Sequence, residues 1–229
     1  MSDAAVPVIA IDGPSGTGKG TISRRVALWL NFHFLDSGAL YRLLGLAARR
    51  GGVDLGDGQA LAVLARSLDI RFEPVPGQDE TSIFLNNEEV TDAIRTENCG
   101  SDASLVAAVP EVRAALLDRQ RAFRVAPGLV ADGRDMGTVV FPDAALKVYL
   151  TASREERANR RYKQLIGKGI GVTLDRLLKE LEARDARDSG RAVAPMKPAA
   201  DAVIVDTTTL NVEQVFSKVQ ALWNAHCER

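Results

Sequence analysis

Cysteine is nearly absent from this 229-residue chain, which contains only Cys99 and Cys227. Two isolated cysteines exclude a disulfide framework and a zinc site of the usual spacing. The sequence also lacks an apolar run of about 18 residues, so we expect no membrane span. Its first twenty residues lack the basic and apolar stretches of a secretory signal. These absences predict a cytoplasmic protein.

The chain also lacks an excess of charge of either sign, since it has 29 Lys and Arg residues and 30 Asp and Glu residues, and its net charge is −1. A neutral surface gives no support to extended nucleic-acid binding. Arginine is nevertheless concentrated in a few stretches, which favours small anionic ligands. Near-neutral charge and the lack of an obvious exposed apolar helix predict a monomer.

The strongest signal in the chain is a glycine-rich stretch between the apolar run 6–11 and a helical pattern that begins near Ile22. Glycines let a loop curl with its N–H groups inward, and the following helix N-terminus and Lys19 add positive charge. A turn that only reverses the chain is the alternative, which the flanking strand and helix disfavour. The predicted phosphate-binding residues are Gly13, Pro14, Ser15, Gly16, Thr17, Gly18, Lys19, Gly20 and Thr21.

This stretch departs from the general phosphate-loop pattern at one position. The pattern G-x-x-x-x-G-K-[ST] matches Gly13, Gly18 and Lys19, but Gly20 follows the lysine and the hydroxyl comes at Thr21.

Apolar stretches that alternate with helical patterns predict an α/β fold with a five-stranded parallel sheet flanked by helices. The expected strands cover residues 7–12, 33–36, 128–132, 145–150 and 202–206. Residues 56–68 read as a helix, and alternating residues with turn signals then follow up to position 91. We therefore expect one domain, 1–229, with a core of 6–55 and 92–229 and a small antiparallel lobe inserted at about 56–91.

Polar residues follow several expected strands. Asp132 ends one strand and is followed at once by Gly133, Arg134 and Asp135, where an α/β sheet usually opens to a ligand. An aspartate there can act on Mg²⁺ or on a substrate, or it can simply cap a helix. Tyr41 and Arg42 lie off the apolar stripe of the helix after residue 36, where ordinary surface positions are the alternative.

Two arginine-rich helical patterns come later. Arg154, Arg157 and Arg161 share a face of one helix, and a glycine-rich break follows this helix. Two interpretations of this arginine face are nearly equal: it contacts phosphate, or it is simply exposed to solvent. In the next helix the stripe of Leu174, Leu177 and Leu181 continues as charged residues. That continuation consists of Arg184, Asp188 and Arg191. It predicts a polar cleft, with internal salt bridges or fraying near residue 190 as alternatives.

These features suit phosphoryl transfer, and four motifs of the chain resemble those of a known family. Residues 12–21, Leu-Asp-Ser-Gly-Ala-Leu-Tyr-Arg at 35–42, Ala-Asp-Gly-Arg-Asp-Met-Gly-Thr at 131–138 and Arg-Asp-Ala-Arg-Asp at 184–188 resemble the bacterial cytidylate kinases. Gly-Lys-Gly-Thr is similar to nucleoside monophosphate kinases generally. The resemblance implies a P-loop NTPase-like fold with a short helical lid at about 154–171.

The resemblance also implies substrates and residue roles. ATP would lie on residues 13–21 with Mg²⁺ between the nucleotides and no dedicated protein metal site, and CMP or dCMP would accept the phosphoryl group. Lys19, Arg134, Arg157 and Arg161 would act on the transferring group. The acceptor would be held by Ser37, Tyr41, Arg42, Ser104, Arg113, Asp132, Arg134, Asp135, Arg184, Asp188 and Arg191. An aspartate at 135 can accept from the cytosine amine but would face an oxygen in uracil, which predicts CMP over UMP.

Two other functions stay open on the sequence. One is a P-loop kinase for another small acceptor such as shikimate or dephospho-coenzyme A. The other is a nucleotide switch, although the guanine-reading pattern N-K-x-D does not occur in the chain.

Overall fold

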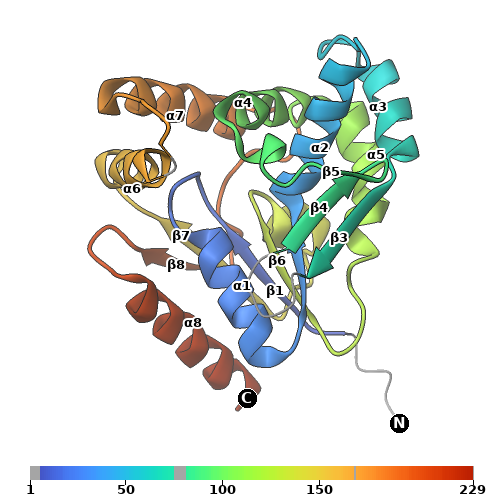
Figure 1. Cartoon of the computed structure of the whole chain (residues 1–229). Helices are drawn as coiled ribbons and strands as arrows, with labels where there is room; N and C mark the ends of the chain where they lie inside the picture. Colours follow the sequence, from blue (N-terminus) through green and yellow to red (C-terminus); the bar gives the residue numbers. More distant parts are fainter. Residues whose placement is uncertain (1–5, 75–80, 168, 229) are drawn as a thin grey trace. The chain divides into compact units, whose positions relative to one another are not determined.

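The computed structural model describes residues 6–74, 81–167 and 169–228 (Figure 1). The chain divides into two compact units. The first unit contains Met1–Asp36 and Arg121–Arg229, and the second contains Ser37–Gln120. Each unit is described by itself below.

The described part of the first unit forms a five-stranded parallel sheet with the order β2-β6-β1-β7-β8 (Figure 1). Its strands are β1 Val8–Asp12, β2 His33–Asp36, β6 Leu129–Gly133, β7 Leu146–Thr151 and β8 Val203–Asp206. Every residue of β1 and β6 is buried, as expected for strands in the middle of a parallel sheet. The structure thus confirms the fold predicted from the apolar stretches.

Helices of the first unit complete its core. They are α1 Lys19–Leu30, α6 Arg154–Ile166, α7 Leu174–Ser189 and α8 Val212–Cys227, with a short π-helical turn, η2, at Met136–Val140. Apolar residues of α1 and α8 pack with those of β1, β6 and β7, and α6 and α7 form a smaller cluster of their own. Ser153, the residue before α6, caps this helix by accepting from the Glu156 N–H at 3.2 Å.

The second unit is helical with a small antiparallel sheet in the order β3-β4-β5. Its elements are α2 Ser37–Arg50, α3 Gly58–Ser67, β3 Ile70–Pro74, β4 Thr81–Leu85, β5 Glu88–Glu89, η1 Ala93–Arg95, α4 Glu97–Val106 and α5 Pro110–Arg121, whose last residue belongs to the first unit. The antiparallel strands confirm the predicted change of rhythm. The turn-rich segment predicted beside them falls largely on 75–80, outside the described residues, and the lobe limits of 56–91 remain a prediction.

Apolar side chains are also found at the surface. No described helix is long and apolar enough to cross a membrane.

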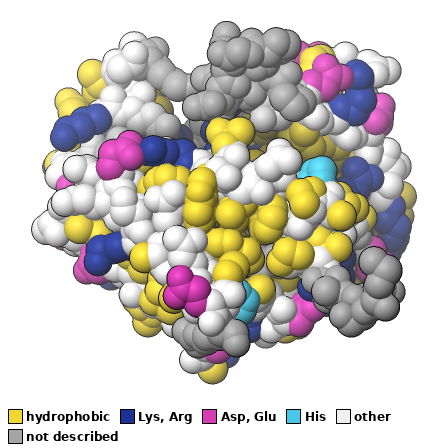
Figure 2. Space-filling model, turned by 90° about the horizontal axis from the view of Figure 1, so that it is seen from below, with side chains coloured by type: hydrophobic (Ala, Val, Ile, Leu, Met, Phe, Trp, Pro, Cys, Tyr) yellow, Lys and Arg dark blue, Asp and Glu magenta, His cyan; other side chains and the backbone are white. Residues whose placement is uncertain are grey.

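Figure 2 shows hydrophobic side chains gathered on one face of the surface. In the first unit Leu28 and Trp29, near the end of α1, are both exposed, and the Trp29 ring meets Phe216 of α8 edge-on with centroids 6.2 Å apart. The sequence predicts no obvious exposed apolar helix, whereas the structure leaves these two large apolar side chains of α1 at the surface.

Candidate active site

The glycine-rich stretch forms a loop between β1 and α1 in which three glycines have positive φ. These are Gly13 at 142°, Gly16 at 81° and Gly18 at 89°. A Cβ on Gly13 would lie 2.0 Å from the Leu150 carbonyl oxygen, so only glycine lets the loop pass over β7. Gly18 takes the N-cap position of α1 and has no side chain, so no side-chain oxygen covers the first turn of the helix. This turn can therefore receive an anion.

Two side chains of this segment hydrogen-bond to the backbone of the loop. The Thr17 hydroxyl donates to the Pro14 carbonyl oxygen at 3.1 Å, and the Lys19 ammonium donates to the same oxygen at 3.2 Å. Thr17 and Lys19 are both buried. The predicted loop residues thus form one curled segment, in which a lysine ammonium stands over the turn.

The Lys19 ammonium also lies 3.9 Å from a carboxylate oxygen of Asp132 in β6. Burial, with Arg134 nearby, lowers the pKa of Lys19 to about 8, although Asp132 opposes this shift. Burial raises the pKa of Asp132 to about 6, against the effect of Lys19. Both groups therefore titrate near neutral pH, as catalytic groups often do. A Cβ on Gly20 would lie 3.3 Å from the second Asp132 oxygen, which favours glycine where the general pattern has serine or threonine.

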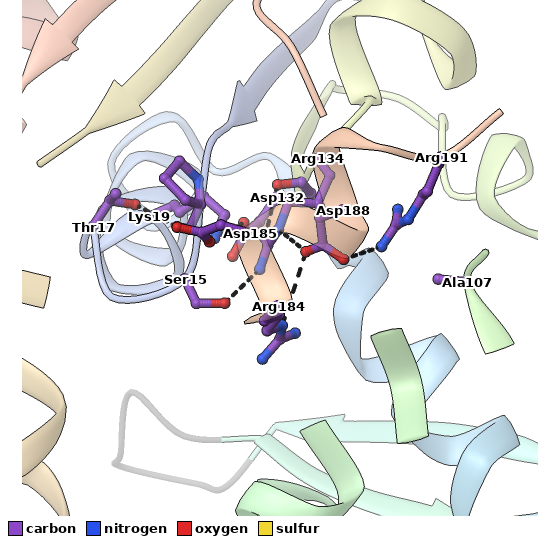
Figure 3. Close-up of polar contacts among 12 residues, drawn as sticks. Ser15, Thr17, Lys19, Ala107, Asp132, Arg134, Arg184, Asp185, Asp188 and Arg191 are labelled. Carbon is purple, nitrogen blue, oxygen red and sulfur yellow. Dashed lines mark hydrogen bonds and ion pairs between the residues drawn. The ribbon is translucent and has the colours of Figure 1, made fainter. Parts of the chain in front are cut away.

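Asp188 of α7 lies at the centre of an arginine cluster (Figure 3). Its carboxylate accepts from Arg191 and from the Arg134 Nε at 3.2 Å, and it lies 3.9 Å from the Arg184 Nε. Asp188 is 1% exposed. We call these four residues the Asp188 cluster. The charged continuation of the α7 stripe is therefore joined by salt bridges through the buried Asp188, and its place in a nucleotide cleft stays a prediction.

Arg134 connects the Asp188 cluster with the phosphate loop. Its Nη2 donates to the Ser15 hydroxyl oxygen at 2.8 Å and its Nη1 to the Gly133 carbonyl oxygen at 3.1 Å. Figure 3 shows Arg134 between Ser15 and Asp188. The Arg134 guanidinium therefore contacts both the phosphate loop, at Ser15, and the Asp188 cluster, at Asp188.

The lid arginines take different positions in the structure. Arg157 is buried and donates to the Ser15 carbonyl oxygen at 3.2 Å and to Asp185 at 2.6 Å. If Gly16 carried a Cβ, that atom would lie 2.9 Å from the Arg157 Cβ, so α6 packs directly on the loop. Arg161 donates to Gln164 of the same helix at 2.6 Å. The structure thus brings Arg157 to the loop, and it shows Arg161 beside a residue of its own helix.

Sequence reasoning gave no role to three residues that contact the site. Arg160 donates to Glu156 of its own helix and also to the Thr17 carbonyl oxygen at 3.3 Å. Asp185 pairs with Arg157, and Asp12 accepts from two amides of the segment after Asp135. Only Asp12 carried a usable signal, as an acid at the end of a buried strand next to the loop.

Five predicted substrate residues belong to the second unit. The Arg113 guanidinium lies over the Tyr41 ring, 5.8 Å from its centroid, and donates to the Ala107 carbonyl oxygen at 3.3 Å. Arg42 donates to the Ile94 carbonyl oxygen at 2.6 Å. Ser37 and Ser104 are buried, as is Tyr41, so the surface reading of Tyr41 was wrong. Within this unit the structure pairs Tyr41 with Arg113.

Metal ligands are sparse in the described ranges. No group of three or more His, Cys, Asp or Glu residues in 6–74, 81–167 and 169–228 is placed to hold a metal ion.

Comparison with known proteins gives one consistent result. The family described as cytidylate kinase matches residues 9–225 of this chain. A cytidylate kinase of Pseudomonas aeruginosa is 59% identical over 227 residues, which are 99% of this chain and 97% of the relative. A cytidylate kinase of Stutzerimonas stutzeri is 60% identical over 214 residues, 93% of each chain.

Proposed function

This chain belongs to the cytidylate kinase family, and from that premise we propose that it transfers the γ-phosphoryl group of ATP to CMP or dCMP. An oxygen of the acceptor phosphate attacks the γ-phosphorus while its bond to the bridging oxygen of ADP breaks. The products are ADP and CDP or dCDP. The observation that carries the proposal is the glycine-rich loop with Lys19 at the start of α1, joined through Arg134 to the Asp188 cluster.

The donor phosphates would lie on the amides of residues 13–21 with the Lys19 ammonium beside them. Mg²⁺ fits this site, because it keeps several waters and binds largely through substrate phosphates, so the sparse protein ligands are no obstacle. The Thr21 hydroxyl, exposed in the first turn of α1, would be its protein ligand. When bound, the ion would neutralise phosphate charge. Lys19 and the loop amides hold the donor in line, which supplies most of what phosphoryl transfer needs from a protein.

Arginines would hold the acceptor and the transferring group. Arg134 is the strongest candidate, since its guanidinium already contacts the loop through Ser15. Arg157 fixes the loop from α6, and we propose that Arg161 joins it when the lid at about 154–171 closes. Asp132 would keep Lys19 oriented, at 3.9 Å from its ammonium.

Asp135 would read the base. Its carboxylate is buried at the start of η2, yet it makes no capping hydrogen bond there. A carboxylate accepts from the cytosine amine and meets an unfavourable oxygen in uracil, so we expect CMP and dCMP to be favoured. Arg184, Asp188 and Arg191 would bind the sugar and base. The remaining predicted substrate residues, Ser37, Tyr41, Arg42, Ser104 and Arg113, belong to the second unit and stay predictions.

We further propose a cytoplasmic monomer that acts on free nucleotides, and neither on nucleic acid nor at a membrane. The net charge of −1 disfavours a polyanionic partner, and the two cysteines, one buried and one exposed, form no disulfide in the described chain. Sedimentation at several concentrations tests the monomer.

Product analysis tests the activity itself. Purified protein with ATP, Mg²⁺ and CMP should give equal amounts of ADP and CDP, and omission of CMP should stop ATP consumption. ATP consumption that ignores CMP would support a nucleotide switch. Phosphorylation of shikimate or dephospho-coenzyme A in place of CMP would support the other alternative.

A further inference from the structure

Asp12, the last residue of β1, accepts two hydrogen bonds from a segment more than a hundred residues away. The Met136 N–H donates to Oδ1 at 2.9 Å and the Gly137 N–H donates to Oδ2 at 2.8 Å. The carboxylate is buried and 5% exposed. Both of its oxygens are therefore used to hold one backbone segment in place.

The two donors are the first N–H groups of η2. Such groups have no partner within their own helical turn, and an aspartate at the N-cap usually accepts from one of them. Asp135 stands at this N-cap position with φ −145° and ψ 23°, and its side chain makes no capping hydrogen bond. Asp12, at the end of β1, accepts from these N–H groups in place of the Asp135 side chain.

The position of Asp12 in the chain makes this contact important. Asp12 is covalently next to Gly13 of the phosphate loop, and Met136 is covalently next to Asp135. Asp12 also pairs with Gly133 in the register of β1 and β6. Strand pairing at Gly133 and the carboxylate at Met136 and Gly137 together hold the backbone on both sides of residues 134 and 135 relative to the start of the loop.

Close packing limits how far the held segment could shift. A Cβ on Gly137 would lie 3.2 Å from the Lys147 side chain and 3.5 Å from the Ala10 Cβ. Lys147 in turn donates to the Pro142 carbonyl oxygen at 2.6 Å. Burial raises the pKa of Asp12 to about 7 even though the two amides lower it. Burial of the charged carboxylate at this position is therefore unfavourable in itself.

We propose that Asp12 is a positioning residue that sets the base reader. By holding the Met136 and Gly137 amides, it places the Asp135 carboxylate for the cytosine amine and thereby determines the preference of the enzyme for cytosine over uracil. This inference rests on the proposed function, because it assumes that Asp135 reads the base.

The phosphate loop has independent support, so its function should depend less on Asp12. Thr17 and Lys19 both donate to the Pro14 carbonyl oxygen, and Arg157 donates to that of Ser15. Loss of the Asp12 carboxylate should therefore disturb acceptor recognition more than ATP binding. A residue with only a structural role would affect both alike.

The test compares Asp12→Asn with Val8→Ala, a buried position at the other end of the same strand. Asparagine keeps the shape, but its NH₂ group must face one of the two amides. We expect the KM for CMP to rise about tenfold and the ratio of kcat/KM for CMP over UMP to fall about tenfold, with the KM for ATP within about threefold. Val8→Ala should lower the melting temperature and leave the ratio unchanged.

Two results separate the inference from the proposed function. A parent protein that does not phosphorylate CMP overturns the proposed function. A parent that prefers CMP, with the same preference in Asp12→Asn, overturns only the inference. If the variant does not fold, hydrogen exchange of the parent decides. The Met136 and Gly137 amides should then exchange at least about tenfold more slowly than those of Leu174 and Asp175, which lie exposed at the start of α7. Equal exchange would contradict the inference.

Discussion

The phosphate loop and the Asp188 cluster bind charge in different ways. The loop presents backbone amides in a path that requires glycine, and Gly13 could carry no side chain beneath Leu150. The Asp188 cluster holds three arginines through a single carboxylate. The loop therefore depends on its backbone and one lysine, whereas the cluster depends on the balance of its side-chain charges. Substitutions should distinguish these two designs.

Loss of the loop lysine should have the largest effect. We expect Lys19→Ala to lower kcat with every acceptor by about 10²- to 10³-fold, because a preorganised charge at the transferring group is removed. Rates measured with saturating ATP and CMP check this. Lys218→Ala, on the exposed side of α8, is the control and should retain full activity. A Lys19→Ala enzyme as fast as the parent would exclude the loop from the reaction.

Removal of the central carboxylate should mainly destabilise the protein. Asp188→Ala leaves the Arg134 and Arg191 guanidinium groups partly or fully buried without their counterion, which should cost about 3–5 kcal/mol in the free energy of unfolding. Urea denaturation measures this loss. Glu180→Ala removes an exposed pair with Arg176 and should cost less than about 0.5 kcal/mol. Equal losses in the two variants would mean that the cluster is not held by Asp188.

Loss of one arginine from the cluster should affect one substrate. Arg191→Ala should raise the KM for CMP about tenfold or more and leave the KM for ATP within about twofold, since this charge belongs to the acceptor side in our proposal. Initial rates at varied concentrations of each nucleotide give both values. Arg176→Ala, exposed on α7, should change neither. A parallel rise in both KM values would place Arg191 outside the acceptor site.

pH should affect the loop more gently. Asp132 has its pKa raised to about 6, so it is ionised above that pH, and Lys19 has its pKa lowered to about 8, so it loses its charge above that pH. The ratio kcat/KM for ATP should therefore be bell-shaped, with limbs near pH 6 and pH 8. In kcat the alkaline limb should move higher, because bound phosphates favour the charged lysine. A flat profile from pH 5.5 to 9 would contradict this reading.

The two regions were not equally predictable from the sequence. The loop follows from local facts, since its glycine spacing, the strand before it and the helix after it lie within one short stretch. The Asp188 cluster depends on distance: periodicity placed Arg184 and Asp188 on the buried face of α7, but Arg134 comes from the end of β6. No local pattern reveals which arginine meets that carboxylate.

Tertiary contacts also explain the other differences. Tyr41 looked exposed by helical spacing, yet it is buried with the Arg113 guanidinium over its ring. Helix α4 carries no clear apolar stripe in the sequence, because its buried face includes small residues such as Cys99, Gly100 and Ala103. Its one clear signal was Thr96, whose hydroxyl caps the helix.

A competition assay tests the central claim most directly. The protein is given ATP, Mg²⁺ and an equimolar mixture of CMP and UMP, and both diphosphate products are measured over time. A base read by hydrogen bonds should be favoured far more strongly than size alone allows, so CDP should exceed UDP by at least about a hundredfold. Equal formation of CDP and UDP would contradict the assignment of Asp135 as the base reader.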